Sequence, residues 1–76
     1  MDPKACLLLA VSRVGSGDYI GVHEALSDYK GWRNRGGFEP REIEYRDGLM
    51  DGDDLAAELW RVYADHELDG EARESF

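Results

Sequence analysis

The chain has 76 residues, of which 17 are acidic and 9 basic, and its formal net charge is -8. A chain this short forms one small domain with a limited core, and its charge disfavours non-specific binding to nucleic acid or to an anionic membrane. The charge is unevenly divided, because residues 1–38 carry four acidic and five basic residues whereas residues 39–76 carry thirteen acidic and four basic ones. We therefore expect an acidic interaction surface and a partner protein with a basic surface.

The apolar run 5–11 contains the chain's single cysteine, Cys6, which we interpret as a small core residue. The run is far shorter than the ~20 residues of a membrane-spanning helix. Asp2 before it and Arg13 after it do not fit a secretory signal. These features predict a cytoplasmic protein that makes no membrane contact.

The first predicted helix covers residues 3–14. Asp2 can accept a hydrogen bond at the helix start, and Pro3 suits the first helical position. Apolar residues surround most of its circumference, which indicates a central helix packed through Leu8 and Leu9. The glycines of 15–17 end it.

The second predicted helix covers residues 18–35, with Asp18 as its cap. Apolar residues recur at steps of three and four and predict one buried stripe, formed by Tyr19, Val22, Ala25, Leu26, Tyr29 and Trp32. Gly36 suits the left-handed residue that closes a helix, and Arg33 and Arg35 complement the last carbonyl groups. We expect Phe38 to fold back toward Trp32.

Between the second and third helices the pattern is weak. "REIEYR" alternates like a short strand, with Ile43 and Tyr45 on one side, but no second strand pattern is present to pair with it. A short helical turn from Pro40 fits equally well. We expect an irregular loop here, and therefore an all-α, three-helix domain.

The third predicted helix covers residues 53–67, with Asp53 as its cap, and an acidic tail over residues 69–76 is expected to fray. Its core stripe contains Leu55, Leu59 and Val62. Trp60 and Tyr63 lie on an adjoining stripe that three short helices cannot also cover. This second stripe predicts a contact between copies of the chain, and hence an oligomer.

The residue pattern favours neither catalysis nor a cofactor. His23 and His66 have acidic neighbours in sequence, but adjacent helical residues point in different directions and do not form acid-base pairs. A calcium-loop template is matched incompletely, with Leu49 where a carboxylate is needed, by Asp47, Asp51, Gly52, Asp53 and Glu58. We predict a protein that is not an enzyme and holds no metal.

Two candidate surfaces remain. The acidic one, for a basic protein partner, consists of Glu42, Glu44, Asp47, Asp51, Asp53, Asp54 and Glu58. The basic one could hold a small anionic ligand and consists of Lys30, Trp32, Arg33 and Arg35. A competing interpretation is that these arginines neutralise glutamates of the following loop, at Glu39, Glu42 and Glu44.

The segment "EALSDYKGWRNRGGFEP", residues 24–40, resembles a pattern found in small uncharacterised proteins of phages and other mobile elements, A-L-x-D-Y-x-x-W-R-x-R-G-G-F-E-P. The matching positions are Ala25, Leu26, Asp28, Tyr29, Trp32, Arg33, Arg35, Gly36, Gly37, Phe38, Glu39 and Pro40. The resemblance covers about a fifth of the chain and carries no known activity.

The resemblance implies a genomic setting in which small acidic proteins without catalytic residues bind and block a host enzyme or defence complex, as anti-CRISPR proteins do. We therefore expect a non-enzymatic interaction protein in the host cytoplasm, an inhibitor that acts through a nucleic-acid-like acidic surface. The alternatives are a small anionic ligand or nucleotide binder that uses Trp32, Arg33 and Arg35, and a structural accessory protein.

Overall fold

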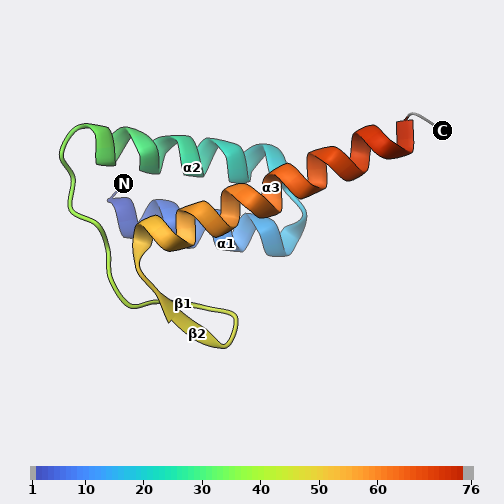
Figure 1. Cartoon of the computed structure of the whole chain (residues 1–76). Coiled ribbons are helices and arrows are strands. Elements are labelled where there is room, and N and C mark those ends of the chain that lie inside the picture. Colours follow the sequence, from blue (N-terminus) through green and yellow to red (C-terminus); the bar gives the residue numbers. More distant parts are fainter. Residues whose placement is uncertain (1, 75–76) are drawn as a thin grey trace.

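Three helices and one β-hairpin form the chain, in the order α1 (Pro3–Ser16), α2 (Tyr19–Asn34), β1 (Ile43–Tyr45), β2 (Gly48–Met50) and α3 (Gly52–Glu74). The structure, a computed structural model, describes the backbone of residues 2–74 and the side chains of residues 2–67. α1 and α2 run antiparallel, α3 crosses them, and the hairpin projects from one side (Figure 1). The prediction of a mostly helical, three-helix chain is confirmed.

Side-chain caps and left-handed glycines set the ends of the first two helices. The carboxylates of Asp2 and Asp18 accept hydrogen bonds from backbone N–H groups three residues on, at 2.7 and 3.0 Å. Gly17 and Gly36 follow the helices with φ of 76° and 86°. α2 agrees with its predicted bounds to within one residue at each end, whereas α1 continues two residues beyond its predicted end, to Ser16.

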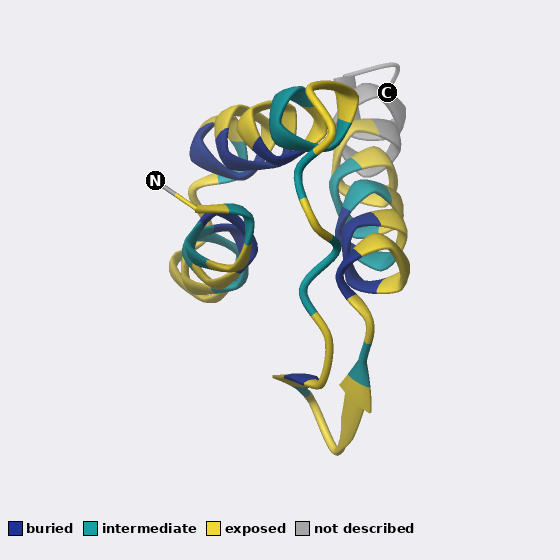
Figure 2. Ribbon diagram, turned by 90° about the vertical axis from the view of Figure 1, so that its left-hand side faces the viewer, coloured by how far each residue is buried: buried dark blue, intermediate teal, exposed yellow. Residues whose placement is uncertain are grey.

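The core lies where the three helices and β1 meet, and Figure 2 shows the buried faces of the helices turned toward one another. Its buried apolar residues are Cys6, Leu7, Ala10, Val22, Ala25, Leu26, Tyr29, Ile43, Leu55, Ala56 and Leu59. The predicted facing of α1 was wrong, because Leu7 is fully buried whereas Leu8 is 47% exposed and Leu9 only partly buried. An unbroken apolar run leaves the buried face of a helix undetermined. Val62 is likewise only partly buried.

The hairpin corrects the all-α prediction for the loop between α2 and α3. β1 and β2 pair antiparallel, with Ile43 opposite Met50 and Tyr45 opposite Gly48. The two-residue turn between them begins at Arg46, whose φ of 56° has the sign that tight hairpin turns require. The strand alternative for Ile43–Tyr45 is confirmed, but its partner was missed because three residues with adjacent Leu49 and Met50 show no alternation.

α3 is longer than predicted at both ends. It begins at Gly52, so Asp53 lies inside the first turn and is not the cap. The helix continues to Glu74, and residues 75–76 lie outside the described chain. The frayed tail expected over residues 69–76 stays a prediction. Most residues of 68–74 are good helix formers, and the single Gly70 costs only about 1 kcal/mol in a helix.

Candidate functional site

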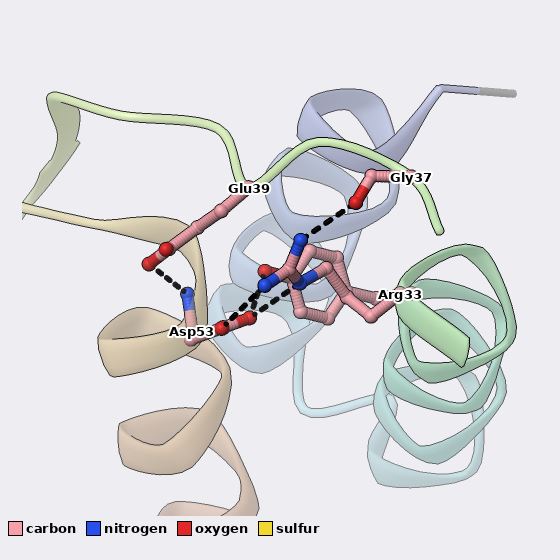
Figure 3. A network of polar contacts seen from close by, with 5 residues as sticks. Arg33, Gly37, Glu39 and Asp53 are labelled. Atoms are coloured by element: carbon pink, nitrogen blue, oxygen red, sulfur yellow. Dashed lines mark hydrogen bonds and ion pairs between the residues drawn. The ribbon is translucent and has the colours of Figure 1, made fainter. Parts of the chain in front are cut away.

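Asp53, in the first turn of α3, is bonded to the end of α2 (Figure 3). Its Oδ1 accepts hydrogen bonds from Nε of Arg33 at 3.0 Å and from the hydroxyl of Tyr29 at 2.6 Å. Its Oδ2 accepts a hydrogen bond from Nη2 of Arg33 at 2.9 Å. A two-pronged pair of this kind determines orientation as well as distance. Tyr29, Arg33 and Asp53 are termed the bridge.

The bridge also holds the loop that follows α2. Nη1 of Arg33 donates a hydrogen bond to the carbonyl oxygen of Gly37 at 2.6 Å, and the N–H of Asp53 donates one to Oε1 of Glu39 at 3.2 Å. Arg33 therefore directs hydrogen bonds from all three of its guanidinium nitrogens into its own chain. The loop between α2 and the hairpin is fastened at two successive points.

Ionisation within the bridge follows from these contacts. Hydrogen bonds from Arg33 and then Tyr29 lower the pKa of Asp53, whereas burial and the hydrogen bond to Asp53 raise the pKa of Tyr29. Asp53 is thus charged and Tyr29 protonated at neutral pH. The side chains of Arg33 and Asp53 remain 31% and 49% exposed, so water screens the ion pair and weakens its contribution to stability.

The four residues of the predicted anion site do not converge. Arg33 turns to Asp53, while the guanidinium carbon of Arg35 lies 5.7 Å from the ring centroid of the half-buried Trp32, and Lys30 is exposed. The competing interpretation named the wrong partner for Arg33, because Asp53 neutralises it and the loop glutamates do not. Gripping an anion with both arginines would require breaking the bridge.

Phe38 does not fold back onto Trp32, contrary to the sequence-based expectation. Its side chain is 92% exposed. Gly37 lies against Trp32 instead, since its N–H donates to the carbonyl oxygen of Trp32 at 2.8 Å and a Cβ at Gly37 would also lie 2.8 Å from that oxygen. Gly37, and not Phe38, is therefore the residue that approaches Trp32 closely.

An open groove of about 880 Å³ lies between the hairpin and α3. It is lined by Glu42, Leu49, Met50, Asp51, Asp54, Ala57, Glu58 and Arg61, and it is termed the acidic groove. Four of its residues belong to the predicted acidic surface, namely Glu42, Asp51, Asp54 and Glu58. Sequence reasoning missed the apolar part of this lining, although the adjacent apolar residues Leu49 and Met50 inside an acidic stretch were a signal that could have indicated it.

The other three predicted acidic residues do not line this groove. Asp53 belongs to the bridge. Glu44 and Asp47 are exposed on the hairpin, Glu44 in β1 and Asp47 in the turn. The predicted surface is therefore divided among three places.

The carboxylates of the acidic groove differ in how far they are neutralised. Glu58 has a side chain only 17% exposed, pairs with Arg61 one turn along α3, and lies 3.8 Å from Nη1 of Arg46. Among the described residues, no ion pair includes Glu42, Asp51 or Asp54. These three carboxylates supply the uncompensated negative charge of the groove.

Trp60 and Tyr63, the predicted contact between copies, pack against α2 of their own chain. The ring of His23 lies 5.3 Å from each of them, centroid to centroid, and His66 stacks on Tyr19 at 3.7 Å. Both aromatic residues are half-buried. The premise that this stripe is uncovered is therefore wrong in part, and self-association through its exposed remainder stays a prediction.

The described residues contain no group of three or more His, Cys, Asp or Glu side chains placed to hold a metal ion. The calcium-loop template is divided between the hairpin turn, where Asp47 lies, and the first turns of α3. Within the same part of the chain, no helix has both the length and the apolar composition needed to cross a membrane.

Comparison with known proteins finds no matching family model, no matching curated protein and no matching solved structure.

Proposed function

We propose that this protein is a non-enzymatic interaction protein that binds a basic surface of a partner protein through the acidic groove. In the phage or mobile-element setting implied by the resemblance of residues 24–40, the partner is a host defence complex that the protein inhibits. The groove would occupy a site that otherwise holds nucleic acid.

The observation that carries this proposal is the acidic groove itself. Glu42, Asp51 and Asp54 have no cationic partner among the described residues, and Leu49, 65% exposed, adds an apolar contact beside them. Carboxylates gathered along one groove offer a basic protein surface the negative charge that phosphates would offer. An exposed apolar residue at the same place supplies contact area that charge alone does not.

The test compares the parent protein with the triple variant E42Q/D51N/D54N, which keeps the shape of each side chain and leaves the bridge intact. Immobilised protein captures partners from a host lysate at low and at high salt, and bound proteins are quantified by mass spectrometry. We expect the true partner to bind the parent protein, to dissociate as salt rises, and to be lost from the triple variant. Inhibition of host defence should be lost in parallel.

The matched control is D28N/D65N/E67Q, which removes the same charge from exposed positions outside the groove. It should retain the partner and the inhibition. A partner that binds both triple variants alike, or whose binding ignores salt, would refute the proposal.

A further inference from the structure

A second open groove lies where the end of α2 meets the start of α1. It is lined by Asp2, Pro3, Trp32, Arg35, Gly36, Gly37 and Phe38, and it is termed the aromatic groove. Its accessible lining is much more strongly apolar than that of the acidic groove, and the two grooves share no lining residue. Two aromatic side chains and one arginine are the residue types that dominate binding energy at protein interfaces.

Phe38 is exposed between two residues that are hydrogen-bonded to the helices, Gly37 through its backbone and Glu39 through its side chain. Before it, Gly37 donates to Trp32 at 2.8 Å and accepts from Arg33 at 2.6 Å. After it, Glu39 accepts the N–H of Asp53 at 3.2 Å. The bridge therefore presents a 92% exposed aromatic ring in a preordered loop, and a partner that covers this ring does not have to order the loop first.

The charge available at the aromatic groove is positive. The Arg35 guanidinium lies over the Trp32 ring, and no ion pair of the described residues includes it. The opposing carboxylate, Asp2, already caps α1 by accepting the N–H of Ala5. A ligand carboxylate beside an apolar side chain would match both parts of this surface.

We propose that the aromatic groove binds a short segment of a partner protein in which a large apolar side chain stands next to a carboxylate. The apolar side chain packs between Trp32 and Phe38, and the carboxylate pairs with Arg35. This site does not depend on the acidic groove, which selects the opposite charge.

The experiment selects binders from a random peptide display library with the parent protein and, in parallel, with F38A. Because Phe38 is exposed, F38A should fold normally, which circular dichroism checks. We expect the parent protein to enrich a class of peptides with a large apolar residue beside Asp or Glu, and F38A to lose that class. Basic peptides that bind the acidic groove should persist on F38A and disappear on E42Q/D51N/D54N.

A synthetic peptide of the enriched class then tests the roles of individual groups. F38A should weaken its binding about tenfold or more, the effect of losing one large buried apolar contact. Replacing the peptide carboxylate with a carboxamide should weaken binding to the parent protein but not to R35Q. E42Q/D51N/D54N should bind the peptide like the parent protein.

Several outcomes would overturn the inference. Peptides with a large apolar residue beside Asp or Glu could fail to be enriched, or could bind F38A and the parent protein equally. A thymidine oligonucleotide could bind where the peptides do not, which would make the occupant single-stranded nucleic acid. The parent protein could self-associate in a way that F38A abolishes, which would make the occupant a second copy of the chain.

Discussion

Gly52 begins α3 in a space without room for a side chain. A Cβ there would lie 2.7 Å from Cδ of Pro40 and 2.8 Å from the hydroxyl oxygen of Tyr29. Gly52→Ala should therefore lower the free energy of unfolding by about 1–3 kcal/mol, measured with urea. Gly15→Ala is the matched control, because nothing lies within 4 Å of its Cβ position, and it should raise stability by up to ~1 kcal/mol. Equal effects at both glycines would contradict the close packing at Gly52.

Asp53 makes stability depend on pH. Its pKa is lowered in the folded protein, mainly by Arg33, so its ionised form stabilises the fold above the unfolded pKa of about 3.9. That stabilisation is lost as the pH falls through the folded pKa. The stability gap between the parent protein and D53N should thus be largest near neutral pH and shrink in acid, as followed by urea unfolding across the pH range. A gap of constant size would show that Asp53 acts through packing and not through its charge.

At the scale of elements, Ile43 is the hairpin side chain that is buried most deeply against the helices, beside the partly buried Tyr45 and Met50. Ile43 is 1% exposed and belongs to the core, whereas Leu49 on the paired strand is 65% exposed. Ile43→Ala should lower the free energy of unfolding by about 2–5 kcal/mol. Leu49→Ala should change it by no more than about 0.5 kcal/mol. If thermal unfolding shows similar losses for both, the hairpin is held by something other than Ile43.

The elements that sequence predicted well are those determined by neighbouring residues. Asp2, Asp18 and Gly36 act on backbone groups within a few positions of themselves, so their patterns predicted helix ends correctly. Contacts between residues far apart in the chain could not be predicted from the sequence. The bond from Arg33 to Asp53 spans 20 positions and depends on how α3 crosses α2.

The two grooves also differ in whether neighbouring residues or distant contacts determine them. A run of carboxylates predicted much of the acidic groove, because charge density is visible in sequence. The exposure of Phe38 follows from anchors on either side of it, one of which, Asp53, lies beyond the hairpin. Since the sequence does not show that Asp53 contacts Glu39, it predicted that Phe38 folds back toward Trp32.

For the whole molecule, the net charge of -8 should oppose folding at low ionic strength. Raising NaCl from about 10 mM to about 0.5 M screens this repulsion and should raise the melting temperature by about 2–8 °C, equivalent to ~0.5–1 kcal/mol in a domain of this size. At low salt, E42Q/D51N/D54N should have a higher melting temperature than the parent protein, and its melting temperature should rise less with added NaCl. Scanning calorimetry measures both. A melting temperature that falls with salt would mean that attractive pairs outweigh the repulsion.

The hairpin turn at Arg46 and Asp47 is also a natural place to divide the molecule. Residues 1–46 hold seven acidic and seven basic residues, whereas residues 47–76 hold ten acidic and two basic, so the second piece carries the entire net charge. Each piece supplies part of the core and one end of the bridge. Two peptides cut at this turn should therefore complement each other, and mixing them should restore a helical circular dichroism signal that neither shows alone. Within one chain, a neutral segment of two helices thus binds an acidic segment that contains the third helix.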